Sequence, residues 1–258
     1  MRTLQCRSGT NSPLEAPSCR NCPVSTACPI GGLPEPQRQP HEYAIQRPPP
    51  LHRGDTLFAA GSPIASISVL RAGSMKRFVL DSKGEEHILQ FNHPGDIPGI
   101  EDIGGSSHQG HAQALETSSI CRIPIPLFSE FMAADGDFRR SIYQRLSRHF
   151  SSITEHALVL ARGSTTERVA AFVVQLSRTQ ARRGFSNCQF RFSMSRYDIA
   201  NYLGMASESV SRVLTGFQEL GLLSVNRRGM LQIHDLETLQ QLGRQSAPHN
   251  GRKKQYCA

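Results

Sequence analysis

The sequence lacks the features of an exported or membrane-inserted protein. No apolar run approaches the roughly 20 residues that a membrane-spanning helix requires. Residues 1–6 carry one positive charge, but no apolar stretch follows them, so no secretory signal is predicted. These absences predict a cytoplasmic protein that does not cross a membrane.

The patterns typical of an enzyme are also missing. We find no nucleophile-base arrangement, no phosphate-binding glycine loop and no dinucleotide-binding fingerprint. Six histidines between positions 41 and 111 show no metal-ligand spacing such as His-x3-His, so we expect them to be ordinary surface or core residues. The sequence therefore predicts no catalytic residue and no enzymatic activity.

The positive charge is concentrated towards the C-terminus of the 258-residue chain, which is long enough for two folded domains. Residues 1–163 contain 16 Lys and Arg against 15 Asp and Glu, a net charge of +1, whereas residues 164–258 contain 13 against 6, a net charge of +7. A domain that binds DNA phosphates has such an excess, because neutralising phosphates and releasing counterions supplies most of the non-specific affinity. A basic surface that only faces solvent would have the same charge, so charge alone does not distinguish it from a DNA-binding surface.

Short apolar runs separated by glycine turns follow a proline-rich start. The clearest predicted strands are 67–70, 75–80 and 87–91. Prolines interrupt residues 1–50, where we expect little regular structure. The predicted fold class is α+β, with an antiparallel β-roll or sandwich after the proline-rich segment.

The apolar period changes to three or four residues after Gly136. This pattern predicts one long amphipathic helix that ends near Gly163. Its apolar stripe could pack on the β domain or on a second copy of itself, and we favour the dimer because DNA-binding proteins often pair two-fold symmetry with palindromic sites. The predicted dimer interface consists of Ile142, Leu146, Phe150, Ile153, Ala157 and Leu160.

The last third has the element order of a winged helix-turn-helix. Capping boxes at 164–167 and 195–198 mark two helix starts. A turn at Gly204 leads into a helix over 207–220, and a hairpin with a basic turn follows at 222–233. Together these patterns predict five segments: a flexible cysteine-bearing segment and Pro-rich linker at 1–50, a β-roll at 51–133, a dimerisation helix at 134–162, a winged helix-turn-helix at 163–243 and a disordered tail at 244–258.

The helix over 207–220 is predicted to bind the major groove of DNA. Glu208, Ser211 and Arg212 project together from its N-terminal end, away from the apolar face. The Arg212 guanidinium can donate two hydrogen bonds to guanine, and the Glu208 carboxylate can accept one from the cytosine amino group. The Ser211 hydroxyl can form a hydrogen bond with either kind of base. The alternatives to base recognition are that Glu208 only stabilises the positive end of the helix dipole and that Arg212 contacts only phosphate. Further candidate DNA contacts are Ser209, Arg196, Arg227 and Arg228.

Seven cysteines in an unexported chain favour metal binding or redox chemistry over a disulfide framework. Cys19, Cys22 and Cys28 have the spacing Cys-x2-Cys-x5-Cys, and thiolates this close together can converge on one metal centre. A fourth ligand must come from elsewhere. Cys121, in the last predicted strand of the β domain, is the first candidate and Cys6 the second. Four cysteines suit either zinc or iron-sulfur.

Several further motifs accompany the cysteines. They are Gly-His-Ala-Gln-Ala-Leu-Glu-Thr at 110–117, Glu-Arg-Val-Ala-Ala-Phe at 167–172, Arg-Gly-Phe-Ser at 183–186, and Asp-Ile-Ala-Asn-Tyr-Leu-Gly at 198–204 leading into Glu208-x2-Ser211-Arg212. The combination covers about residues 19–243 and resembles the cyclic-AMP-receptor/FNR superfamily of bacterial transcription regulators, specifically its oxygen-sensing FNR/ANR branch.

The resemblance implies a cyclic-nucleotide-binding-like jelly roll, a dimerisation helix and a winged helix-turn-helix. It implies a [4Fe-4S] cluster on Cys19, Cys22, Cys28 and Cys121. It also implies a homodimer that binds palindromic double-stranded DNA with TTGAT-like half-sites and contacts RNA polymerase through surface loops such as 82–86. In the implied cycle, the intact cluster pins the cysteine segment to the β domain and favours dimerisation, and oxygen destroys the cluster.

The chain differs from the superfamily pattern at two points. Residues 99–107 contain no arginine for a cyclic nucleotide phosphate, so no cyclic nucleotide is expected to bind. Prolines between 34 and 48 interrupt the helix that the branch implies after Cys28. The alternatives are a regulator of the same fold that senses thiol oxidation or carries structural zinc and, from another class, an iron-sulfur enzyme.

Overall fold

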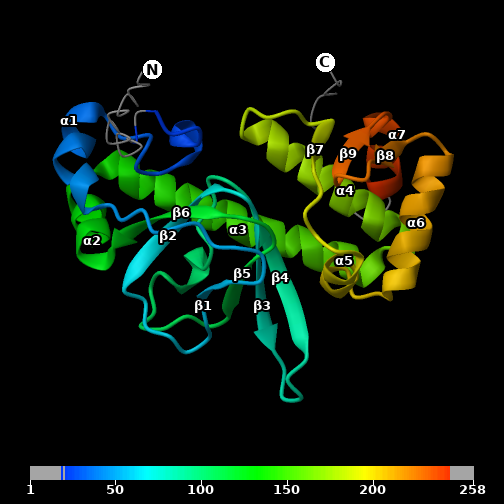
Figure 1. Ribbon diagram of the computed structural model, residues 1–258, viewed down its shortest axis with the longest axis horizontal. Coiled ribbons are helices and arrows are strands. Elements are labelled where there is room, and N and C mark those ends of the chain that lie inside the picture. The colour runs from blue at the N-terminus through cyan, green and yellow to red at the C-terminus, as the bar shows by residue number, and fades with distance from the viewer. Residues whose placement is uncertain (1–18, 20, 245–258) are drawn as a thin grey trace, which may run out of the picture.

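The computed structural model of the protein describes residue 19 and residues 21–244 (Figure 1). A β-rich body and a mostly helical body lie along one long helix. Cys6 and positions 245–258 of the predicted tail lie outside the described residues. Among the residues described, no helix is both long enough and apolar enough to span a membrane.

The β-rich body is an antiparallel roll, as predicted. One sheet has the strand order β1-β5-β3-β4, and β2 pairs with β6 in another. The predicted strands 67–70, 75–80 and 87–91 are confirmed as β2, β3 and β4. The six strands are β1 (Thr56–Phe58), β2 (Ser66–Ala72), β3 (Met75–Leu80), β4 (Glu86–Asn92), β5 (His111–Ala114) and β6 (Ser119–Pro124), and a 3-10 helix, η3 (Ile100–Asp102), lies between β4 and β5.

Strand β2 is buried on both faces, which positions the N-terminal segment. Leu70 packs with Met75 and Ile120 inside the roll. Ile67 and Val69 point to the other face, since side chains alternate along a strand, and pack with the N-terminal segment. Burial on both faces explains why residues 67–70 form one continuous apolar run.

The described part of the N-terminal segment consists of short helical turns rather than one helix. They are η1 (Ser25–Ala27), α1 (Glu35–Arg38) and η2 (Gln39–Ala44). Its apolar side chains Ile30, Leu33 and Ile45 are buried against the β2 and β6 sheet. Backbone hydrogen bonds of 2.9 Å in both directions between Gln46 and Arg122 attach the end of the segment to β6.

Two helices connect the β-rich body to the rest of the chain: α2 (Ile125–Ala134) and α3 (Gly136–Arg162). The long helix α3 is confirmed, and Asp135 caps it by accepting a hydrogen bond of 2.7 Å from the Phe138 amide. Helix α2 was not predicted, because it follows β6 directly, with prolines at positions 124 and 126, and its apolar residues resemble a continuation of that strand.

The C-terminal body is the predicted winged helix-turn-helix. Its elements are α4 (Thr165–Arg182), β7 (Gln189–Arg191), α5 (Arg196–Tyr202), α6 (Ser207–Glu219), β8 (Leu223–Val225), β9 (Met230–Ile233) and α7 (Leu236–Arg244). Both predicted capping boxes are formed, at Ser164 and Ser195. Strand β9 lies between β7 and β8 in the small sheet. Helix α7 packs against α4 and was not predicted.

The apolar core of the winged body extends into the β-rich body, where it includes Ile88 and Phe91 of β4 and Leu115. Phe91 of β4 lies with its ring centre 5.1 Å from that of Tyr202 in α5. Asn201 of α5 also bonds the free edge of β4, accepting from the Ile88 amide at 2.7 Å and donating to the Glu86 carbonyl at 2.6 Å. The winged body is therefore held against the β-rich body through side chains distant in sequence.

The cap of α5 offers a test of local stability. The Ser195 hydroxyl accepts from the Asp198 amide at 3.0 Å and donates to the Asp198 carboxylate at 2.6 Å. We expect Ser195→Ala to lower the free energy of unfolding by about 0.5–2 kcal/mol, and Ser195→Gly by only a few tenths, because glycine is tolerated at helix N-caps. Chemical denaturation monitored by circular dichroism measures both values, and equal losses would contradict the capping role.

Candidate metal centre and nucleic-acid interface

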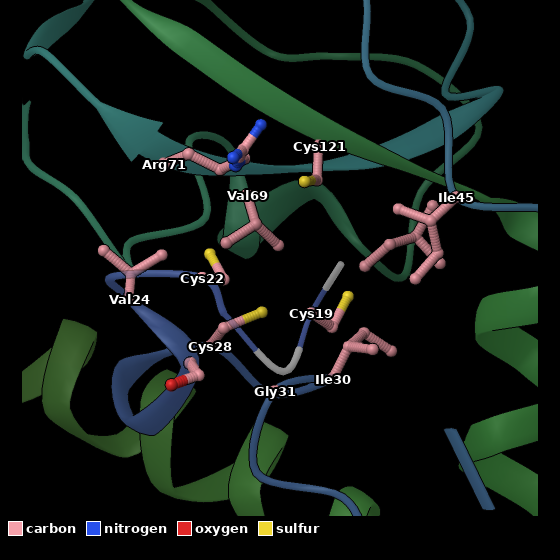
Figure 2. Close-up of a pocket in the computed structure, with 12 residues that line it drawn as sticks. Cys19, Cys22, Val24, Cys28, Ile30, Gly31, Ile45, Val69, Arg71 and Cys121 are labelled. Atoms are coloured by element: carbon pink, nitrogen blue, oxygen red, sulfur yellow. The ribbon is translucent and has the colours of Figure 1, made fainter. Parts of the chain in front are cut away.

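Four cysteines from two distant parts of the chain line one pocket. Cys19, Cys22 and Cys28 come from the N-terminal segment and Cys121 from β6, and Figure 2 shows their sulfur atoms around a common space. The free cavity between them is small, with a volume of about 20 Å³. The structure thus brings together the three clustered cysteines and the first of the two candidates for a fourth ligand.

Local backbone geometry brings the three N-terminal cysteines to the pocket. Hydrogen bonds from the Ala27 and Cys28 amides to the Val24 and Ser25 carbonyls close the tight turn of η1. Gly31 passes so close to the Ser25 backbone that a Cβ atom at position 31 would overlap it. On the opposite wall, Cys121 is fixed by antiparallel pairing with Val69.

The environment of the thiols is apolar. Burial, followed by the Glu42 carboxylate, raises the pKa of Cys19 to about 12. Burial also raises the pKa of Cys28 and of Cys121 above the usual thiol value. Without a bound metal these three thiols are therefore protonated at neutral pH, and a metal centre would have to displace their protons.

The donor set fits a thiolate-bound metal centre. The sulfur atoms share the pocket with hydrocarbon side chains, which limit water access and therefore suit a sulfur-ligated centre. These side chains are Val24, Ile30, Ile45, Val69 and Ile123. Within the described residues, no three Cys, His, Asp or Glu side chains are arranged to hold a single metal ion.

The predicted DNA-binding residues gather on one exposed face of the winged body. Val210, Leu214 and Phe217 are the buried side of α6. Four of the seven predicted residues line a shallow groove between the start of α5 and α6, namely Arg196, Glu208, Ser211 and Arg212. Ser209 is half-buried outside this groove lining, and Arg227 and Arg228 are exposed in the turn between β8 and β9.

Five further residues line the groove and were not predicted to contact DNA: Tyr197, Ser207, Thr215, Gly216 and Glu219. Tyr197 is 62% exposed in the first turn of α5, and Thr215 follows Ser211 by four residues on the same face of α6. Helical spacing alone could have identified Thr215. Tyr197 gave no such signal, since its place in the groove depends on how α5 packs against α6.

The apolar stripe of α3 has a buried part and an exposed part. Ile142 is 1% exposed and belongs to the core of its own β-rich body, and Leu146 packs against the same core. Phe150 and Ile153 are 62% and 48% exposed. Of the remaining predicted residues, Ala157 is exposed and Leu160 half-buried. Tyr143, seven residues before Phe150, is also exposed and was not predicted.

Comparisons with known proteins agree with this architecture. Residues 49–135 match the cyclic nucleotide-binding domain family and residues 167–242 the Crp-like helix-turn-helix domain family. The chain is 36% identical over 224 residues to an anaerobic regulatory protein of Pasteurella multocida, and the aligned part is 87% of this chain and 82% of the relative. The chain is also 35% identical over 224 residues to the fumarate and nitrate reduction regulatory protein of Escherichia coli strain K12, where the aligned part is 87% of this chain and 89% of the relative.

The chain belongs to the CRP/FNR family of transcription regulators. As in that family, a DNA-binding helix-turn-helix follows the β-roll, so the predicted fold and the predicted class of DNA-binding regulator are confirmed. The cysteine segment at 19–28 precedes both matched domains.

Solved structures share the fold of this CRP/FNR-family chain. FixK2 from Bradyrhizobium japonicum superposes with a TM-score of 0.69 at 24% identity, covering 77% of this chain and 96% of its own. A CRP-family transcriptional regulator from Thermus thermophilus gives a TM-score of 0.59 at 20% identity, covering 75% and 95%. At these identities the likeness concerns the fold.

Proposed function

We propose that this CRP/FNR-family chain regulates anaerobic gene expression and senses oxygen through a [4Fe-4S] cluster on Cys19, Cys22, Cys28 and Cys121. The observation that carries the proposal is the convergence of four thiols, from two distant parts of a DNA-binding regulator, on one apolar pocket. The names of the anaerobic regulatory relatives support the same function. When bound, the cluster would supply a redox-active centre sensitive to oxygen.

A direct contact links the cysteine segment to α3. Arg145 of α3 donates to the Ala27 carbonyl, next to Cys28, and to the Gly95 carbonyl at 3.1 Å. A change in the position of the segment therefore acts on the helix that carries the exposed stripe. We infer that the ordered segment favours the α3 arrangement in which two copies pair, which makes a homodimer the DNA-binding form.

The DNA-binding form would read palindromic sites with TTGAT-like half-sites through Glu208, Ser211 and Arg212. Arg196 and Ser209, together with the wing residues Arg227 and Arg228, would add further contacts. A regulator of this kind works where bacterial DNA and RNA polymerase are, in the cytoplasm. The β3–β4 turn at 82–86 would contact the polymerase.

The interior of the β-roll supports the expectation that no cyclic nucleotide binds. Buried Arg77 forms ion pairs with Glu101 at 2.7 Å and with Asp102 at 3.2 Å. Both carboxylates come from the segment in which the superfamily places its phosphate-binding residues. They neutralise Arg77 and would repel a phosphate.

Anaerobic purification tests the proposal. We expect coloured protein that contains iron and acid-labile sulfide, loses its visible absorbance in air, and binds a duplex with two inverted TTGAT half-sites more tightly before exposure to air than after it. Colourless protein that contains zinc would instead support the alternative regulator with a structural metal. Metal-free protein whose DNA affinity changes with thiol oxidants would support the thiol-sensing alternative.

Loss of the Arg212 guanidinium should weaken specific DNA binding. We expect Arg212→Ala to raise the dissociation constant for the palindrome by about 5- to 150-fold, corresponding to the roughly 1–3 kcal/mol of a bidentate base contact, and to relax discrimination at the contacted base pair. Arg228→Ala is the matched control in the exposed wing: it should weaken all sequences about equally and reduce the salt dependence of binding. Gel-shift titrations at several salt concentrations measure both effects, and unchanged discrimination in R212A would refute base reading.

A further inference from the structure

We propose that Arg71 tunes the cysteine site by holding a positive charge beside it that slows oxidation of the bound centre by dioxygen. The inference rests on the proposed function. Arg71 lies near the end of β2, where the pairing with β6 is irregular, and it lines the pocket together with Val69. Figure 2 shows its side chain beside Cys121, on the wall opposite the N-terminal segment.

Within the described part of the chain, the Arg71 side chain has no ion-pair partner. Its Nε atom is buried and makes no hydrogen bond among the described residues, which is unusual for a buried donor.

Arg47, which contacts Cys19 but does not line the pocket, has a different environment. Arg47 donates to the Cys19 sulfur at 3.6 Å, but it also lies 3.5 Å from the Glu42 carboxylate. Glu42 in turn accepts a hydrogen bond from the Cys19 amide. Part of the charge of Arg47 is thus compensated by Glu42, whereas Arg71 has no carboxylate partner among the described residues.

The direction of the effect follows from charge. Four thiolates give the bound centre a net negative charge, which a nearby guanidinium stabilises. In the first oxidation step dioxygen takes one electron and leaves as superoxide, and the charge at the site becomes more positive by one. The uncompensated cation disfavours that step. Removing it should lower the reduction potential of the site and accelerate the loss of the centre in air.

The experiment compares the full-length wild-type protein with Arg71→Gln, Arg71→Lys and Arg122→Gln, all loaded anaerobically. Arg122 is the matched control, because it adjoins Cys121 on β6 but does not line the pocket. We expect R71Q to lose its visible absorbance in air about three- to tenfold faster and to have a more negative midpoint potential, whereas R71K and R122Q stay close to wild type. Thermal unfolding midpoints identify any variant whose fold is damaged.

The outcomes separate this inference from the proposed function. Iron-loaded R71Q with the wild-type rate and potential would overturn the role of Arg71 and leave the proposed function intact. The role of Arg71 would also be overturned if the bleaching rate and potential of R122Q changed as much as those of R71Q, or if R71Q did not take up iron anaerobically. A wild-type protein without iron and sulfide would overturn the proposed function, and this inference with it.

Discussion

Cys121→Ser protein purified without oxygen is expected to be colourless, with its iron and sulfide content reduced at least tenfold. Cys121 supplies the pocket's thiol from the β scaffold, whereas the other three come from one N-terminal segment. Changes in the groups that merely support metal ligands already cost about 10- to 100-fold in metal affinity, so loss of a ligand should cost more. Iron, sulfide and visible absorbance per chain measure the effect.

The fold of this variant should survive, because serine is nearly the size of cysteine and the pairing of β6 with β2 uses backbone groups. Ser119→Ala, on the same strand β6 but outside the pocket, is the matched control and should keep full iron content. A C121S protein that retains wild-type iron would remove Cys121 from the ligand set and make Cys6 the next candidate. Combining the exchanges at positions 6 and 121 would then test that assignment.

Local patterns predicted most of the fold. The capping boxes at Ser164 and Ser195 fixed two helix starts, and the change of apolar period after Gly136 identified α3. These features depend on residues three or four apart. Helices α2 and α7 escaped prediction because their form depends on what they pack against.

Contacts between distant residues were less accessible from the sequence. The spacing of Cys19, Cys22 and Cys28 indicated a metal centre, but the residues alone left Cys121 and Cys6 open as fourth ligand, and the resemblance favoured Cys121. Nothing local distinguished Arg71 from any other strand residue, since its relation to the site depends on the neighbouring Cys121 strand. The bonds of Asn201 to β4 join residues 113 and 115 positions apart and leave no periodic signal.

The predicted dimer interface on α3 is another feature that the sequence alone could not resolve. Periodicity placed Ile142 and Phe150 on one stripe, but it could not show that the β-rich body covers the first part of that stripe. In the structure Ile142 is 1% exposed and Phe150 is 62% exposed. The stability of the single chain therefore depends on Ile142, and pairing of two chains should depend on Phe150 and its exposed neighbours.

Phe150→Asp is accordingly expected to abolish dimerisation without unfolding the chain. Burying a phenylalanine side chain stabilises a dimer by about 1.5–3 kcal/mol, and a two-fold symmetric interface buries this side chain twice. We therefore expect the dissociation constant of the dimer to rise at least a hundredfold. Affinity for the palindrome should fall as a result, because each chain reads one half-site. Analytical ultracentrifugation of anaerobic protein measures the dimer.

Gln144→Asp is the matched control for this change. It introduces the same charge on α3 at an exposed position that helical geometry places away from the Tyr143, Phe150 and Ile153 stripe, so the dimer should persist. Ile142→Ala should behave in the opposite way, lowering the free energy of unfolding by about 2–5 kcal/mol because a buried core side chain is truncated. An F150D protein that dimerises like wild type would show that the exposed stripe of α3 is not the dimer interface. The contact between Arg145 and the cysteine segment would then have to influence the winged body instead.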